Sequence, residues 1–167
     1  MPAADPQDPR ELPATRQLDQ LGVPYVIHRH PPLYTVAEAK ELRGDIDAAH
    51  VKNLFLRDKK EQMWMVTVLE GRPVDTKELR ALLGATGTVS FGSPDRLRRV
   101  LGIEPGSVSP LALVNDPEGV VRIVLDEGLH DYTHVGVHPL HNEATLRLAV
   151  LDLVRFLEAS GRSPIWI

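Results

Sequence analysis

A short segment rich in glycine, serine and proline is the first place where this sequence could do chemistry. Gly106–Pro110 reads Gly-Ser-Val-Ser-Pro, a composition that predicts an irregular loop. Glycine lets the backbone approach a ligand closely, and successive backbone N–H groups can hold an anion or a developing oxyanion without help from a side chain. A loop of this composition is also a common connection between a helix and a strand. By itself the segment fits both a binding loop and a plain connection.

A lysine lies at the start of an apolar, strand-like run. Lys52 is followed by Asn53, Leu54 and Phe55, so its ammonium group is expected where a strand enters a sheet. There it could hold a phosphate or a carbonyl oxygen as a point charge. It could equally protect the edge of the sheet against pairing with another chain. The sequence leaves both roles open.

Histidines gather near the C-terminal part of the chain, at positions 130, 134, 138 and 141. A spacing of four could place zinc ligands on one helix face, but Gly136 and Pro139 interrupt the segment and no His-Glu-x-x-His motif is present. His134–His138 instead alternates as a strand does. The chain has no cysteine, which excludes thiolate nucleophiles and cysteine-based metal sites. We expect no metal and no cofactor, and a metal-dependent hydrolase built on these histidines is a rival hypothesis.

The elements that must position these residues alternate between helical and strand-like patterns. Capping residues, glycine stops and apolar stripes predict helices at about 12–21, 35–42, 75–83 and 95–101, and a longest helix that begins at Asn142 or Thr145. β-Branched and aromatic runs predict strands at 23–28, 53–57, 63–69, 88–91, 111–114 and 120–125. The last two strands are expected to form a hairpin. Hairpins interleaved with helices predict a single α+β domain with a mixed, mostly antiparallel sheet flanked by helices.

Length and composition agree with one compact domain. The 167 residues, with 43% hydrophobic and 25% charged content, fit a single core, and we expect a domain over residues 10–167 after a mobile leader at residues 1–9. No run of 18 apolar residues and no signal-peptide pattern is present, so we expect a cytoplasmic protein without a membrane span. The net charge of −4 argues against non-specific coating of nucleic acid but leaves room for a local basic patch.

Several of these features occur together, in order, in one known family. Lys52–Asp58 resembles the lysine-bearing strand of the YbaK/ProX family of aminoacyl-tRNA editing enzymes, and Gly106–Leu111 resembles that family's loop with glycine and proline four positions apart. Gly136–Thr145 is similar to the C-terminal segment of the subgroup related to the editing insertion of bacterial prolyl-tRNA synthetase. Two further runs also match: Leu21–Tyr25 and Thr35–Ala39. The resemblance extends over about residues 10 to 160.

The resemblance implies a deacylase that removes alanine from mischarged tRNA for proline, with prolyl-tRNA synthetase as a further partner. Backbone N–H groups of the loop would hold the aminoacyl carbonyl while water attacks with help from the ribose hydroxyl of the substrate. The residues assigned to catalysis are Lys52, Gly106, Ser107, Val108, Ser109 and Pro110. Whether Lys52 acts in catalysis or only binds substrate stays open. The residues assigned to the substrate pocket are Asn53, Thr35, His138, Asn142 and Thr145.

The same resemblance implies how the substrate is selected. A small pocket would admit alanine and exclude the larger proline by size. Basic side chains that could contact the acceptor stem of the tRNA are Lys59, Lys60, Lys77, Arg80, Arg96, Arg98 and Arg99. Two alternatives stay open: editing of tRNA that carries cysteine or serine, and a module of the same fold that binds nucleic acid without catalysis.

Overall fold

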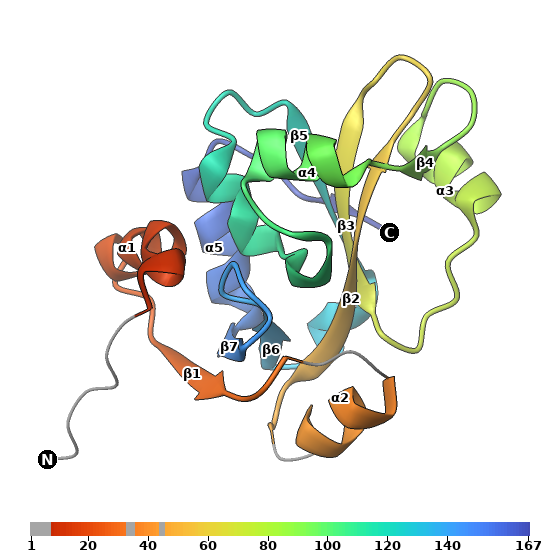
Figure 1. The fold of residues 1–167 in the computed structure, drawn as a ribbon. Helices are drawn as coiled ribbons and strands as arrows, with labels where there is room; N and C mark the ends of the chain where they lie inside the picture. The colour runs from red at the N-terminus through yellow and green to blue at the C-terminus, as the bar shows by residue number, and fades with distance from the viewer. Residues whose placement is uncertain (1–7, 33–35, 44–45) are drawn as a thin grey trace, which may run out of the picture.

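The computed structural model describes residues 8–32, 36–43 and 46–167, and Figure 1 shows the course of the chain. Within these ranges the α-helices are α1 (Leu12–Gln20), α2 (Val36–Arg43), α3 (Thr76–Leu83), α4 (Pro94–Leu101) and α5 (Val150–Ala159). The strands are β1 (Tyr25–Arg29), β2 (Ala49–Arg57), β3 (Met63–Leu69), β4 (Ser90–Phe91), β5 (Val121–Leu125), β6 (His134–Val137), β7 (Ala144–Ala149) and β8 (Ile165–Trp166). Short 3-10 helices occupy Pro9–Glu11, Pro105–Ser107, Pro110–Asn115 and Glu127–Asp131.

All of these strands join one mixed sheet. The strand order is β1-β7-β6-β2-β3-β5-β8, and β4 pairs with β2 beside that path. Pairing is antiparallel for β1–β7, β7–β6, β2–β3 and β2–β4. It is parallel for β6–β2, β3–β5 and β5–β8. The predicted α+β class, with a mixed and mostly antiparallel sheet flanked by helices, is confirmed.

The helix ends follow local capping chemistry. The Asp75 carboxylate accepts a hydrogen bond from the Lys77 amide at the start of α3, and Gly84 ends the helix with a φ of 64°. The Ser93 hydroxyl accepts from the Arg96 amide at the start of α4, which Gly102 ends with a φ of 65°. Only glycine adopts such positive φ values without a steric cost. These two helices therefore begin and end where the sequence predicts.

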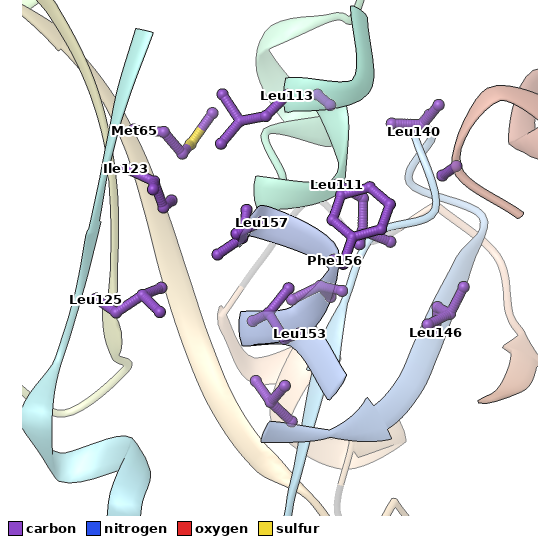
Figure 2. Close-up of a cluster of buried hydrophobic side chains, with 14 of the residues drawn as sticks. Met65, Leu111, Leu113, Ile123, Leu125, Leu140, Leu146, Leu153, Phe156 and Leu157 are labelled. Carbon is purple, nitrogen blue, oxygen red and sulfur yellow. The ribbon is translucent and has the colours of Figure 1, made fainter. Parts of the chain in front are cut away.

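The core lies on both faces of the central strands. One face packs against α5 and the 3-10 helix Pro110–Asn115, where Leu111, Phe156 and Leu157 meet Met65 and Ile123 of the sheet (Figure 2). A smaller cluster fills the opposite face and packs against α3; its fully or largely buried members are Leu56, Trp64, Val66, Val68, Leu79, Leu83, Val89 and Val124. Alternate residues of β3 thus enter different clusters, as the two-residue period of a strand requires.

Two predicted elements are wrong. Leu111–Val114 is not a strand but part of the 3-10 helix Pro110–Asn115, and β5 pairs in parallel with β3 instead of closing a hairpin. A buried apolar run of four residues fits either a strand or a helix, and here Ser109 and Pro110 set a helical start. The longest helix does not begin at Asn142 or Thr145, because Ala144–Ala149 forms β7 and α5 begins at Val150.

The N-terminal predictions fall partly outside the described residues. Residues 1–7 of the predicted leader lie there, while Asp8 caps the 3-10 helix Pro9–Glu11 through its side chain. Thr35, predicted to cap a helix and to line the substrate pocket, also lies outside the described residues. No helix in the part of the chain that the structure describes is long and apolar enough to cross a membrane.

Candidate functional site

The Gly106–Pro110 loop carries backbone amides that could hold an oxygen atom. The Ser107 amide donates to the Glu104 carbonyl, but among the described residues the amides of Val108 and Ser109 have no hydrogen-bond partner. Ser109 is itself 0% exposed, and its hydroxyl accepts from the Leu111 amide at 3.2 Å. Buried amides are nearly always paired. Two consecutive unpaired amides can therefore hold a carbonyl or an oxyanion.

A cavity of about 510 Å³ opens beside this loop. Gly106 and Ser107 line one side of it, and Leu140, His141 and Asn142 line another. A Cβ atom placed on Gly106 would lie 3.5 Å from Asn142 Nδ2, so the loop and the segment that precedes β7 approach each other closely. The fold thus brings the predicted residues Gly106, Ser107 and Asn142 together although 35 residues of chain separate them.

Strand register places three further predicted residues on one face of the sheet. Gly136 of β6 pairs with His50 of β2 and with Arg147 of β7. Because side chains on alternate positions share a face, His138, Lys52 and Thr145 all lie on the face of these partners. Asn53 lies on the opposite face, where its Oδ1 accepts a 2.6 Å hydrogen bond from the Thr67 hydroxyl.

A second, smaller cavity of about 40 Å³ lies where β2 and β6 part. The pairing of these two strands ends at His50 and Gly136, and beyond that point the described strands are not joined. The cavity is lined by His50, Val51, Asn53, Gly136, Val137, His138 and Thr145. The predicted pocket residues Asn53, His138 and Thr145 therefore meet at one small crevice between two strands.

Hydrogen bonds fix two walls of this crevice. His138 Nδ1 lies 3.3 Å from the Ala144 carbonyl oxygen, which closes the loop between β6 and β7. The Thr145 hydroxyl lies 2.9 Å from Nε2 of His30, which follows β1 in the chain. The sequence analysis did not predict a role for His30. The ring of His138 and the hydroxyl of Thr145 are thus held by neighbouring backbone and side-chain groups.

Lys52 lies on the same sheet face as His138 but does not line either cavity. Its side chain is half-buried, and its ammonium group has no hydrogen-bond or ion-pair partner within residues 8–32, 36–43 and 46–167. A cation that is partly withdrawn from water without a counter-ion is available to a negatively charged or carbonyl-bearing ligand. Among the described residues β2 pairs with β6 only at Ala49 and His50, so the side of β2 that faces β6 has no partner strand at Lys52 and an edge-guarding role fits as well.

A buried ion-pair cluster that sequence reasoning missed adjoins the larger cavity. Glu11 is 0% exposed, and its carboxylate accepts hydrogen bonds from Arg29 at 3.0 and 3.1 Å and from His141 Nε2 at 2.7 Å. Burial alone would raise the pKa of Glu11, but the hydrogen bonds from Arg29 and His141 outweigh it and the pKa is lowered. A sequence signal existed, because Glu11 falls on the buried stripe that Ala14, Thr15 and Leu18 form in α1.

The basic residues predicted to contact tRNA gather at one end of the molecule. Lys59 and Lys60 lie in the β2–β3 turn, and the other predicted side chains lie on α3 (Lys77, Arg80) and on α4 (Arg96, Arg98, Arg99) (Figure 1). The Arg96–Glu61 ion pair, at 3.0 Å, ties α4 to the β2–β3 turn, and the Lys59 amide donates to the Thr86 carbonyl after α3. Among the described residues, none of these basic side chains lines the larger cavity beside the Gly106–Pro110 loop or the smaller crevice between β2 and β6.

The histidines do not form a metal centre in the described part of the chain, where no group of three His, Asp or Glu side chains could hold a metal ion. The His130 ring packs against Trp166 with 4.2 Å between ring centroids, and His134 Nδ1 lies 3.0 Å from the Thr133 hydroxyl. His138 and His141 belong to the crevice and to the Glu11 cluster, respectively. The rival hypothesis of a zinc hydrolase therefore gains no support from the geometry.

Known proteins resemble this chain in sequence and in fold. Residues 30–156 match the family model described as the aminoacyl-tRNA editing domain. The prolyl-tRNA editing protein ProX of Acetoanaerobium sticklandii is 37% identical over 148 residues, which cover 88% of this chain and 90% of that protein. The prolyl-tRNA synthetase associated domain-containing protein 1 of Mus musculus is 34% identical over 154 residues, 90% of each chain. A solved structure described as a candidate trans-editing enzyme for prolyl-tRNA synthetase shares the fold, with a TM-score of 0.73, 21% identity and 95% and 96% of the two chains covered.

Proposed function

Since this chain belongs to the aminoacyl-tRNA editing domain family, we propose that it is a trans-acting deacylase that removes alanine from mischarged tRNA for proline. The reaction is the hydrolysis of the ester between the alanyl carbonyl and the ribose of the terminal adenosine. Water adds to the carbonyl carbon, the ester C–O bond breaks, and the products are free alanine and tRNA with its ribose hydroxyl restored. The relatives named for prolyl-tRNA editing support proline-specific tRNA as the partner.

The observation that carries this proposal is that the amides of Val108 and Ser109 find no hydrogen-bond partner in the described part of the chain. An ester carbonyl becomes an oxyanion as water attacks, and N–H groups fixed in advance stabilise that charge without reorganisation. No side-chain nucleophile is then required. The substrate's own ribose hydroxyl would help to orient the water and take part in moving its proton, which is the mechanism that the family resemblance implies.

Lys52, His138 and Asn142 have binding roles in this proposal. The ammonium group of Lys52, which has no partner within the described ranges, would hold the phosphate of the terminal nucleotide or a polar group of the aminoacyl ester. His138 and Thr145, on the same sheet face, would line the pocket for the amino acid. Asn142, in contact distance of Gly106, would help to close the loop over the ester.

The crevice between β2 and β6 supports alanine as the substrate. With a volume of about 40 Å³ against about 510 Å³ for the cavity beside the Gly106–Pro110 loop, it is much the smaller of the two cavities and suits a small side chain. The pyrrolidine ring of proline is larger than the methyl group of alanine and would fit such a crevice less well. Because a rigid site rejects a larger side chain by steric conflict, correctly charged prolyl-tRNA would survive. Serine and cysteine are close to alanine in size and are the nearest competitors.

Release of labelled alanine from alanyl-tRNA for proline by the purified chain tests this proposal, with prolyl-tRNA for proline as the control substrate. We expect rapid loss of alanine and retention of proline. Seryl- and cysteinyl-tRNA for proline, assayed alongside, would identify a different amino-acid preference. Binding of the tRNA without release of any amino acid would contradict the deacylase and favour a binding module of the same fold.

The basic end formed by the β2–β3 turn, α3 and α4 is proposed to contact the acceptor stem of the tRNA. Replacing Lys59 and Lys60 together by glutamate should raise KM severalfold and leave kcat unchanged, because phosphate contacts add affinity and register but no chemistry. The effect should shrink at high salt, where the wild-type contacts are themselves screened. Replacing Arg16 on α1 and Arg155 on α5 together by glutamate changes the net charge by the same amount and should leave KM unchanged. An equal rise of KM there would show that net charge alone is responsible.

A further inference from the structure

The buried Glu11 cluster joins three parts of the chain at the edge of the larger cavity. Glu11 ends the 3-10 helix Pro9–Glu11, Arg29 ends β1, and His141 lies in the loop between β6 and β7. Glu11 and His141 are 0% and 4% exposed. A carboxylate so fully withdrawn from water is tolerated only with partners that satisfy both of its oxygens, as Arg29 and His141 do.

The contacts of His141 define the tautomer of its ring. Nδ1 accepts a hydrogen bond from the Glu143 amide at 3.0 Å, so Nε2 carries the proton that is donated to Glu11 at 2.7 Å. The ring therefore links the loop's own backbone to a carboxylate 130 residues away. A second layer reinforces this link, because Arg10 pairs with Asp8 at 2.7 Å and with Glu143 at 3.1 Å.

The loop that this cluster holds is not a relaxed turn. Leu140 has a φ of 72°, a left-handed value that costs a branched, non-glycine residue free energy and persists only where the surroundings impose it. The Glu11–His141 hydrogen bond acts on the very next residue. Removing this hydrogen bond should let the loop relax. The same loop carries Asn142, which lies beside Gly106, and the contact between His138 and the Ala144 carbonyl closes it.

We propose that Glu11 and His141 are positioning residues of the deacylation site. Through His141 the buried carboxylate fixes the 138–144 loop so that His138 and Asn142 keep their places against the crevice and the Gly106–Pro110 loop. Neither Glu11 nor His141 acts on the ester itself. This inference rests on the proposed deacylase function, and it predicts a loss of kcat that exceeds any loss of substrate affinity.

A matched pair of variants separates positioning from stability. Glu11→Gln removes a buried charge that pairs with Arg29, and Asp126→Asn removes a nearly buried charge that pairs with Arg72 and accepts from the Leu69 and Gly128 amides. Asp126 lines neither cavity of the site. Both variants would be compared at a temperature where each is fully folded, by deacylation kinetics and by amide hydrogen exchange.

Glu11→Gln should lower kcat by about 10- to 100-fold with KM changed less than threefold, because small misplacements of positioning groups are costly in the transition state. Exchange should accelerate in residues 140–144 and stay unchanged in residues 125–131, and Asp126→Asn should show the reverse exchange pattern with unchanged kcat. His141→Gln should lower kcat to a similar extent, and the double variant should be no worse than either single one.

The outcomes distinguish this inference from the function on which it rests. A wild-type chain that releases no amino acid from any mischarged tRNA for proline overturns the proposed function and, with it, the positioning role. An active wild type with unchanged kcat in Glu11→Gln overturns the positioning role alone. Equal losses of kcat in Glu11→Gln and Asp126→Asn, or additive losses in the double variant, would likewise assign the effect to general destabilisation.

Discussion

The two halves of the sheet differ in what covers them. In the half built on β3 and β5, both faces are apolar: Trp64, Val66 and Val124 enter one cluster, and Met65 and Ile123 enter the other. In the half built on β1, β7 and β6, one face is apolar, with Val135, Val137, Leu146 and Leu148 fully or almost fully buried. The opposite face of that half carries His28, Gly136, His138, Thr145 and Arg147.

This difference separates stability from chemistry within one sheet. Burial of apolar area on both faces supplies most of the free energy of folding, and it leaves no space for a polar ligand. A strand with one polar face stabilises less but can present histidine, threonine and lysine side chains at fixed spacings. Lys52 joins the polar face because β2 lies between the two halves and pairs with both. Changes in the apolar half should therefore alter unfolding, and changes on the polar face should alter turnover.

The largest expected effect on stability is in the apolar half. Trp64 is 1% exposed, and Trp64→Ala would leave a cavity between β3 and α3. We expect the free energy of unfolding to fall by about 3 to 5 kcal/mol, measured by urea denaturation. The kcat of the folded fraction at low temperature should stay within about twofold, since positioning groups of the site lie elsewhere. A loss of kcat in a fully folded Trp64→Ala sample would break the proposed separation of the two halves.

Lys52→Ala should have the opposite effects, leaving the free energy of unfolding nearly unchanged and lowering the rate of deacylation. With no partner for the ammonium group among the described residues, its removal should change the free energy of unfolding by less than about 0.5 kcal/mol. Deacylation should fall by a factor on the order of 100, the typical loss when one group that binds a reacting oxygen or phosphate is removed. Arg16→Ala, at an exposed position of α1 outside every proposed contact, is the control and should retain full activity. An unchanged rate in Lys52→Ala would remove Lys52 from the site.

A smaller effect is expected from adding one methyl group to the crevice. A Cβ atom on Gly136 would lie 2.9 Å from Thr145 Cγ2, so Gly136→Ala must push Thr145 or fill part of the 40 Å³ cavity. We expect kcat/KM for alanyl-tRNA to fall about tenfold, in the range of one methylene in a fitted pocket. Gly71→Ala is the control, because a Cβ atom there meets no atom within 4 Å. Equal kinetics for the two variants would show that the crevice does not receive the alanyl side chain.

Sequence reasoning succeeded where the signal is local. Asp75, Gly84, Ser93 and Gly102 act on atoms within a few residues of themselves, so their roles as helix caps can be predicted from spacing alone. It failed at Leu111–Val114, because strand and helix bury a short apolar run equally well. The local start at Ser109 and Pro110 is helical, and the run packs against the distant elements α1, α4 and α5.

The site itself was predictable only in part. The family resemblance assigned His138, Asn142 and the Gly106–Pro110 loop to a site, and that assignment stays a prediction. The crevice depends on where β2 and β6 part, which is a property of the strand register. The Glu11–His141 pair spans 130 residues, and nothing local to either residue predicts the other. Contacts of that kind are set by topology, so periodicity and motif spacing cannot reveal them.

The smallest expected effect is the response to acid of two of the buried carboxylates, Glu11 and Asp126. Burial would raise the pKa of Asp126 as well as that of Glu11, but in each case hydrogen bonds and a nearby arginine outweigh burial, and both pKa values lie below their ordinary values of 3.8 and 4.5. The unfolded chain therefore binds these protons more tightly than the folded protein does. The stability that each carboxylate contributes is complete above about pH 5 and is lost as the pH falls through its folded pKa.

We therefore expect the free energy of unfolding to decline as the pH is lowered from 5 to 3, measured by urea denaturation at each pH. Glu11→Gln and Asp126→Asn should each flatten that decline. As the pH is lowered, residues 140–144 of the wild type should lose protection against hydrogen exchange, because protonation of Glu11 releases His141. In Glu11→Gln, which has no carboxylate at this position, protection of the same residues should not change over this pH range. If the free energy of unfolding declined equally steeply in all three proteins, other carboxylates would govern the response to acid. The Glu11–Arg29 and Asp126–Arg72 ion pairs would then contribute to the structure but not to its pH dependence.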